Sequence, residues 1–170
     1  LVGSEMCIRD RLDCSFFQAS TAEMFGEVLD SPQDESTLMS PSSPYGISKC
    51  AAHQLVKNYR LTHGIRCASG ILFNHESPLR GREFVTRKIS FQLAKILKGE
   101  KTPIQLGNLN SKRDWGYAPD YILAMEEIIN AKNMDDYIIS TNEVASVRDF
   151  FKRCAIVAGF DPVFEGEGIN

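Results

Sequence analysis

The stretch SPYGISKCAAHQLVKNYRLTHGIRCASGILFN, from Ser43 to Asn74, contains a helix signal followed directly by a strand signal. Ser43 is a favoured N-cap residue, and Pro44 fits the first helical position, where its missing N–H costs nothing. Apolar side chains then repeat at helical spacing, at Ile47, Ala51, Leu55 and Tyr59. Gly64 is a natural stop, so the pattern predicts a helix from Pro44 to the residue before Gly64.

Residues 65–74 (IRCASGILFN) form a continuous apolar run, typical of a strand buried on both faces of a parallel sheet. Further strands are expected over residues 14–20 (CSFFQAS), 102–108 (TPIQLGN) and 136–141 (DYIIST). Helices are expected over residues 84–99, from about Pro119 to Asn130, and over 146–159, and turns or loops over 26–44, 75–83 and 113–118. Strands that alternate with helices predict an α/β protein with a doubly wound parallel sheet.

Composition excludes several classes of function. The 170 residues carry a formal net charge of −3, which gives no basic surface for nucleic acid. No apolar run approaches the roughly 20 residues of a membrane span. The three histidines and five cysteines show no spacing typical of metal ligands, so no metal site is predicted. The odd cysteine count argues against a disulfide framework and fits a reducing, cytoplasmic setting.

Tyr45 and Lys49 stand four residues apart at the start of the predicted helix and therefore share one helix face. The lysine ammonium would favour the phenolate form of the tyrosine, which could then exchange a proton with a sugar or alcohol hydroxyl. Tyr-x-x-x-Lys is also a common chance pattern, so the interpretation depends on the surrounding sequence.

Polar residues follow three of the predicted strands, over residues 17–23, 71–76 and 138–142. The carboxyl ends of parallel strands meet at one edge of a sheet, where doubly wound proteins bind ligands. We therefore expect a hydroxyl, a carboxylate, a phenol and an ammonium to meet there, from Thr21, Glu23, Tyr45 and Lys49. Simpler interpretations stay open: the Ser20-Thr21 pair could be a cap or turn, and Glu23 could complete a capping box with Ser20.

Seven strings of this sequence are similar to the GDP-mannose 4,6-dehydratases, a group within the extended short-chain dehydrogenase/reductases. They are QASTAEMFGEV, SPYGISK, NYRLTHGI, GILFNHESPLRG, FVTRKI, LGNL and RDWGYAPDY, and the resemblance covers about residues 15–159. GILFNHESP and FVTRKI are far more specific than Tyr-x-x-x-Lys. The resemblance implies a partial Rossmann-like sheet plus part of a smaller substrate-binding region. It also implies conversion of GDP-mannose to GDP-4-dehydro-6-deoxy-D-mannose and water, with transient reduction of NADP.

The resemblance also implies a role for each matching residue. Tyr45 would take the proton of the sugar C4 hydroxyl, Lys49 would hold the nicotinamide ribose, and Thr21 would hydrogen-bond the C4 oxygen. Glu23 would remove the C5 proton and then assist departure of the C6 hydroxyl. The cofactor contacts implied are Tyr45, Lys49, His75 and Arg80, and the substrate contacts are Asn74, Lys88 and Arg113. The partners implied are GDP-mannose and, in the full-length protein, further copies of the same chain.

The sequence departs from the family pattern in two places. Ala22 stands where the family usually has serine. No glycine-rich Gly-x-x-Gly-x-x-Gly turn, which cradles the cofactor pyrophosphate, occurs anywhere in the chain. LVGSEMCIRDR, at residues 1–11, has the look of a non-native adapter-derived segment. Residues 12–75 are expected to be the C-terminal part of the NADP-binding Rossmann domain, and residues 76–170 a substrate-binding region with the last Rossmann elements. This piece alone is expected neither to bind NADP well nor to turn over.

Two alternative functions remain at this point. One is another nucleotide-sugar dehydratase or an epimerase of the same superfamily, against which Glu23 argues because a simple 4-epimerase needs no base at C5. The other is a non-catalytic module that binds a nucleotide sugar or mediates subunit contacts. The complete set of Thr21, Glu23, Tyr45 and Lys49 argues against such a module, while the missing glycine-rich turn argues for it.

Overall fold

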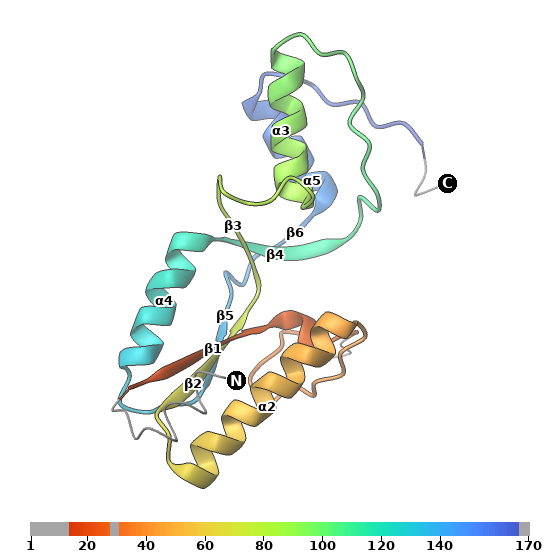
Figure 1. Cartoon of the computed structure of the whole chain (residues 1–170). Coiled ribbons are helices and arrows are strands. Elements are labelled where there is room, and N and C mark those ends of the chain that lie inside the picture. The colour runs from red at the N-terminus through yellow and green to blue at the C-terminus, as the bar shows by residue number, and fades with distance from the viewer. Residues whose placement is uncertain (1–13, 28–30, 167–170) are drawn as a thin grey trace. The chain divides into compact units, whose positions relative to one another are not determined.

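The computed structural model describes residues 14–27 and 31–166 of the chain (Figure 1). The predicted non-native segment at residues 1–11 lies outside the described residues. Two compact units are present. The first consists of the residues up to His75 together with Gly116–Ser140, and the second of Glu76–Trp115 together with the residues from Thr141 onward.

The first unit is built on a parallel three-stranded sheet in the order β1-β2-β5, which confirms the predicted α/β class. Its strands are β1 (Phe16–Thr21), β2 (Cys67–Leu72) and β5 (Asp136–Ile139). Helix α2 (Pro44–His63) covers one face of this sheet and α4 (Ala118–Asn130) covers the other (Figure 1). Every residue of β2 is buried, as expected for a central strand covered on both faces.

The carboxyl ends of the three strands lie side by side. Thr21 pairs with Leu72, and Leu72 in turn pairs with Ile139. The short 3₁₀ helix η1 (Ala22–Met24) follows β1 directly. Beyond this edge, Asn74 begins the short strand β3 (Asn74–Glu76), where the sequence predicted only a loop after residue 74.

Helix α2 has the ends that the sequence predicts. The Ser43 hydroxyl accepts a hydrogen bond from the Gly46 N–H at 3.0 Å, and Pro44 occupies the first turn. Gly64 ends the helix in the left-handed region at φ 64°, which a residue with a Cβ adopts only at a cost. The position and length of this helix were therefore readable from local sequence.

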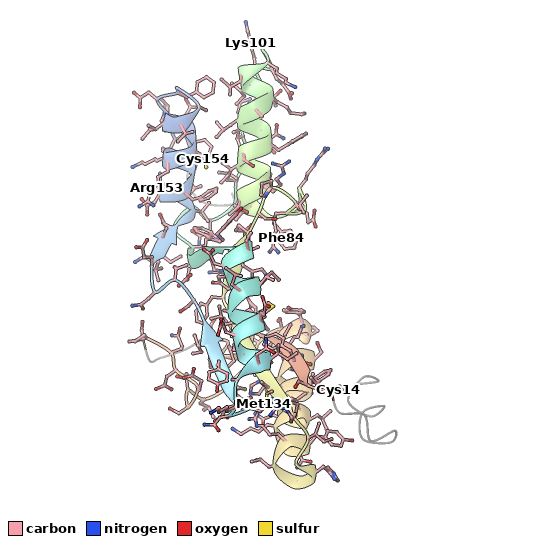
Figure 2. All side chains as sticks on the ribbon, turned by 90° about the vertical axis from the view of Figure 1, so that its left-hand side faces the viewer. Cys14, Phe84, Lys101, Met134, Arg153 and Cys154 are labelled. Carbon is pink, nitrogen blue, oxygen red and sulfur yellow. The ribbon has the colours of Figure 1, made fainter. Side chains whose placement is uncertain are left out.

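Helices α3 and α5 pack against each other in the second unit, as the view of their side chains shows (Figure 2). Its elements are α3 (Val85–Leu97), β4 (Lys112–Tyr117), which continues into the first unit, β6 (Val144–Ser146) and α5 (Val147–Val157). The buried centre of the unit is formed by Ile89, Leu93, Val147 and Ala155. Ser146 caps α5 in a reciprocal capping box with Asp149, and Gly159 follows the helix at φ 79°.

Two predictions for the second unit are wrong. Residues 102–108 form no strand; Ile104 and Leu106 instead pack as partly buried side chains against the core of the unit. The strand forms at Lys112–Tyr117, part of which was predicted to be a turn, and it pairs antiparallel with β6. This pairing joins residues that are distant in sequence, which local pattern does not reveal.

Cys50, Cys67 and Cys154 are free thiols. Cys14 is disulfide-bonded, whereas the odd cysteine count of the sequence argues against a disulfide framework. No helix within the described residues combines the length and the apolar character needed to cross a membrane.

Candidate active site

The carboxyl end of β1 carries the first two predicted site residues. The Thr21 hydroxyl accepts a hydrogen bond from the Glu23 N–H at 3.3 Å, so Thr21, and not Ser20, caps η1. The side chain of Glu23 is exposed, and its carboxylate makes no hydrogen bond or ion pair with any described residue. The capping-box alternative for Glu23 is therefore not what the structure contains, and its carboxylate is free to act on a ligand.

Lys49 and Tyr45 lie next to each other at the start of α2. The Lys49 ammonium donates a hydrogen bond to the backbone carbonyl of Ala19 at 2.9 Å, and it lies 5.8 Å from the centre of the Tyr45 ring. Tyr45 itself is 54% exposed, so its phenol can reach a ligand. The lysine therefore ties the start of the helix to β1 two residues before Thr21.

Gly46 allows the first turn of α2 to approach η1 closely. A Cβ at this position would lie 2.7 Å from the carbonyl oxygen of Glu23 and 3.0 Å from Cβ of Pro41, closer than side-chain atoms normally approach. Absence of a side chain at Gly46 thus brings the segment that bears Tyr45 against the segment that bears Glu23.

These contacts gather a hydroxyl, a carboxylate, a phenol and an ammonium at one edge of the sheet, from Thr21, Glu23, Tyr45 and Lys49. Chemically, such a set contains two separate groups that can accept a proton, the phenolate and the carboxylate, and a cation that can hold a hydroxyl-bearing ligand. The roles of the individual residues remain predictions.

His75 lies just beyond the end of β2 in the same unit. Its Nδ1 is 3.0 Å from the Phe73 carbonyl oxygen, and its ring packs against Tyr121 with 5.0 Å between ring centres. A carbonyl oxygen only accepts, so Nδ1 carries a proton and Nε2 is left for another partner. This geometry suits a residue that contacts a ligand through Nε2. Asn74, its neighbour, is half-buried.

The other three predicted binding residues belong to the second unit. Arg80 forms an ion pair with Glu76 at 3.4 Å and lies over the Phe84 ring, 3.6 Å from its centre. Lys88, on α3, lines a cavity of about 970 Å³ whose wall includes residues 103–107. Arg113 is exposed on β4 and donates to the carbonyl of Lys112 at 2.7 Å. Of these three cations, Lys88 is the one placed in the wall of a cavity large enough for a nucleotide.

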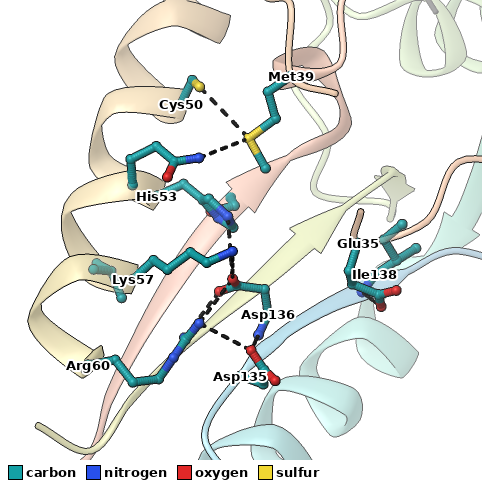
Figure 3. Close-up of polar contacts among 12 residues, drawn as sticks. Glu35, Met39, Cys50, His53, Lys57, Arg60, Asp135, Asp136 and Ile138 are labelled. Atoms are coloured by element: carbon teal, nitrogen blue, oxygen red, sulfur yellow. Dashed lines mark hydrogen bonds and ion pairs between the residues drawn. The ribbon is translucent and has the colours of Figure 1, made fainter. Parts of the chain in front are cut away.

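The sequence analysis missed a buried polar network behind the site (Figure 3). His53 Nδ1 lies 3.0 Å from the Ser20 hydroxyl, and His53 Nε2 lies 3.7 Å from the Asp136 carboxylate. Arg60 donates to both carboxylate oxygens of Asp136, at 3.1 and 3.0 Å, and Lys57 adds a second cation at 3.7 Å. The signal available in the sequence was the spacing, since His53 and Lys57 continue the four-residue repeat of Tyr45 and Lys49.

Burial and charge act on the two titratable groups at the centre of this network. Burial is the largest influence on the His53 imidazole; together with the cations of Lys57 and Arg60 it holds the pKa below the ordinary 6.5, against the opposing Asp136 charge. Burial alone would raise the pKa of the Asp136 carboxyl, but the Arg60 hydrogen bonds and charge, with His53, outweigh it and leave the pKa below 3.8. The folded chain therefore contains a neutral His53 beside an ionised Asp136.

The lowered pKa of His53 predicts that acid destabilises the fold. The unfolded chain binds a proton at His53 more readily than the folded chain. The contribution of neutral His53 to the free energy of unfolding is therefore complete above about pH 6.5. This stabilising contribution declines as pH falls below about 6.5 toward the lowered pKa of His53 in the folded state. Urea denaturation between pH 7.5 and 5.0 should show the free energy of unfolding falling with pH. His53→Leu should flatten this dependence, and His63→Gln, at an exposed histidine of the same helix, should leave it unchanged; an unaltered slope in His53→Leu would contradict the assignment.

Comparison with known proteins identifies a matching family and several similar relatives. The profile of the family described as GDP-mannose 4,6 dehydratase matches residues 5–170. The GDP-mannose 4,6 dehydratase of Homo sapiens is 46% identical over 155 residues, which cover 91% of this chain and 42% of the human protein. The GDP-mannose 4,6-dehydratase of Vibrio cholerae is 43% identical over the same length, again with 91% and 42% covered. This chain thus spans less than half the length of these relatives.

Solved structures show the same fold. RMD from Pseudomonas aeruginosa, complexed with NADPH, superposes with a TM-score of 0.87 at 22% identity, covering 94% of this chain and 56% of that one. The dTDP-glucose 4,6-dehydratase of Bacillus anthracis, in complex with NAD, gives a TM-score of 0.82 at 22% identity, covering 94% and 51%. The structural likeness supports the Rossmann-like fold. With the profile match over nearly the whole chain and 46% identity to the human protein, the chain belongs to the GDP-mannose 4,6-dehydratase family.

Proposed function

We propose that the full-length protein containing this chain converts GDP-mannose to GDP-4-dehydro-6-deoxy-D-mannose and water, with NADP as its cofactor. The observation that carries this proposal is the gathering of Thr21, Glu23, Tyr45 and Lys49 at the carboxyl end of β1. It supplies the two separate acid/base groups that removal of water from a hexose requires.

The first of these groups acts at C4 of the sugar. The Tyr45 phenolate accepts the proton of the C4 hydroxyl, and the Thr21 hydroxyl hydrogen-bonds the same oxygen as it becomes a ketone. Lys49 lies on the next helical turn, with its ammonium 5.8 Å from the centre of the Tyr45 ring. When bound, NADP would supply the redox chemistry, as acceptor of the hydride from C4 and donor of the hydride to C6.

The second group acts at C5 and C6. The C4 ketone makes the C5 proton acidic, and the Glu23 carboxylate removes it. The same carboxyl then gives its proton to the C6 hydroxyl, which leaves as water. The hydride taken from C4 would then add to C6, and a proton equivalent to the one that Tyr45 took from the C4 hydroxyl returns to C5. Because Glu23 is exposed and makes no hydrogen bond with a described residue, no internal partner has to be displaced before it binds the substrate.

The residues of this chain are chemically suited to NADP. The Lys49 ammonium and the Tyr45 hydroxyl can bind ribose hydroxyls, and Nε2 of His75 is available because Nδ1 is taken by the Phe73 carbonyl. Arg80 supplies a positive charge for phosphate oxygens. Lys88, in the wall of the second-unit cavity, is proposed to bind the diphosphate of GDP-mannose. Asn74 and Arg113 are proposed as further substrate contacts on the family resemblance alone. A homo-oligomeric, cytoplasmic enzyme is proposed on the family resemblance.

Assay of the full-length protein with two substrates and two cofactors tests the proposal. With GDP-mannose and NADP we expect a 4-keto-6-deoxy product, detected by mass spectrometry as the loss of one water. We expect no such product from dTDP-glucose, and less from GDP-mannose when NAD replaces NADP. A product that keeps the mass of the substrate would identify an epimerase, and dehydration of dTDP-glucose alone would identify a different dehydratase; either result contradicts the proposal.

A further inference from the structure

One face of α2 is polar where it meets the sheet. Tyr45, Lys49, His53 and Lys57 follow one another at four-residue spacing, and Arg60 follows three residues later, so all lie on one stripe of the helix. A helix that covers a sheet normally presents apolar side chains along such a stripe. In α2 the stripe contacts polar atoms of β1 and β5 instead (Figure 3).

The contacts of the stripe fall on consecutive residues of β1. The Ala19 carbonyl accepts from Lys49, and the Ser20 hydroxyl contacts His53. Thr21, the next residue, is the proposed catalytic hydroxyl. The partner of His53 is therefore the residue that lies between the anchor of Lys49 and the site itself.

The centre of the network is closed to water. His53 is 1% exposed, Ser20 2% and Asp136 8%. Buried polar groups are costly unless they are paired, so only positions of α2 that preserve these hydrogen bonds are stable. The carboxylate of Asp136 only accepts, which favours the imidazole proton on Nε2 and leaves Nδ1 to accept from Ser20. Each contact is directional, unlike an apolar contact that tolerates a small rotation.

A small movement of α2 would displace the Lys49 ammonium substantially at the site. One residue of helix corresponds to about 100° of rotation and 1.5 Å of rise, so a fraction of such a step would take the Lys49 ammonium away from the Ala19 carbonyl. Arg60 fixes the helix at Asp136 of β5, and His53 fixes it at Ser20 of β1. These contacts with β1 and β5 hold α2 in place, and with it Tyr45 and Lys49 at the start of the helix.

We propose that Ser20, His53, Asp136 and Arg60 form a positioning network that fixes the rotation and height of α2 on the sheet and so holds Lys49 and Tyr45 beside Thr21. The positioning of Lys49 stands on the contacts above; its consequence for turnover rests on the proposed function. His53 and Ser20 are positioning residues and touch neither substrate nor cofactor.

The first test follows Lys49 in this chain and needs no activity. Ser20→Ala and His53→Leu each remove the contact between Ser20 and His53. Hydrogen exchange of the Lys49 ammonium, followed by nitrogen-15 NMR on the folded protein, should speed up about fivefold as the bond to Ala19 weakens. His53→Asn, whose amide oxygen can stand in for Nδ1, should restore most of the protection. Ile89→Val, in the core of the second unit, should lower stability without changing Lys49.

The second test follows turnover in the full-length protein, at a temperature where every variant is folded. Ser20→Ala and His53→Leu should lower kcat by about 10- to 100-fold, with a smaller change in KM, because a displaced catalytic group costs about that much. His53→Asn should recover kcat. If His53→Leu does not fold, Ser20→Ala alone carries both tests.

The outcomes separate the two proposals. Wild-type ammonium exchange and wild-type kcat in a folded Ser20→Ala variant would overturn the positioning network. Faster exchange of Lys49 in a protein without dehydratase activity would support the network and contradict the proposed function. Faster exchange with an unchanged kcat would show that the contact of Lys49 with Ala19 does not matter for catalysis, which also overturns the inference.

Discussion

Arg60→Met is expected to lower the free energy of unfolding of the chain by about 3–5 kcal/mol, a large part of the stability of an ordinary domain. The Arg60 guanidinium donates to both oxygens of Asp136, and their side chains are only 9% and 6% exposed. Methionine keeps the apolar stem but removes the charge, so the buried carboxylate loses both hydrogen bonds from Arg60 and keeps Lys57 and His53 at 3.7 Å. A buried charge that loses its hydrogen-bonded partner is costly, because the remaining contacts do not replace those hydrogen bonds.

Urea denaturation followed by far-UV circular dichroism measures this loss. Arg66→Met is the matched control, since Arg66 is exposed and its contacts with Ser15 and Ala131 are long, at 3.3 Å; we expect less than about 1 kcal/mol. The double variant Arg60→Met, Asp136→Leu should be more stable than Arg60→Met alone, because no unpaired charge remains. A loss below about 1 kcal/mol for Arg60→Met would mean that the carboxylate is solvated or neutralised without Arg60.

The network that contains Arg60 also shows where sequence reasoning stops. The ends of α2 were predictable because caps are local: Ser43, Pro44 and Gly64 act within one turn of their own positions. The partners of the helix are not local. His53 contacts Ser20, which is 33 residues away in the sequence, and Arg60 contacts Asp136, which is 76 residues away. The one sequence feature that distinguishes a histidine facing the sheet from one facing solvent is its spacing: His53 stands four residues after Lys49 and so on the same helix face.

The wrong prediction of a strand at residues 102–108 has the same cause, namely that partners distant in sequence decide the structure. Residues 102–108 contain apolar side chains and suggest a strand, but a strand needs a neighbour to take its backbone hydrogen bonds. β4 finds such a neighbour in β6, where Arg113 pairs with Ala145, although its own sequence is polar and aromatic. Asp114 is buried there because its carboxylate accepts from the N–H and hydroxyl of Thr141. Tertiary pairing thus outweighed local propensity.

The predicted site depended on two kinds of signal. The meeting of strand ends followed from the parallel sheet, and the register of Thr21, Leu72 and Ile139 confirms it. The roles of single residues came from resemblance, and contacts alone do not assign them. Glu23 is the clearest case, since an exposed carboxylate after a strand could be a catalytic base or an ordinary surface charge.

Glu23→Gln in the full-length protein distinguishes these possibilities. Glutamine keeps the shape of the side chain, and the hydrogen bond from the backbone N–H to Thr21 does not involve the carboxylate, so the fold should be unchanged. The carboxamide cannot take the C5 proton. General acid–base groups contribute about 10²–10⁴-fold, so dehydration should fall by about that factor. Oxidation at C4 needs only Tyr45, Lys49 and Thr21 and should continue, and absorbance of reduced nicotinamide should accumulate after GDP-mannose is added, because C6 has not lost its hydroxyl and cannot receive the hydride.

Two further variants make this result specific. Tyr45→Phe removes the proposed base for the first step, so it should abolish both product and the absorbance of reduced nicotinamide. Glu27→Gln removes another exposed carboxylate of the same segment and should behave as wild type. The accumulating signal separates a catalytic Glu23 from a structural one, because a merely destabilised enzyme would lose both half-reactions together. If Glu23→Gln forms the 4-keto-6-deoxy sugar at the wild-type rate, Glu23 is a surface carboxylate and the C5 proton must leave to another group.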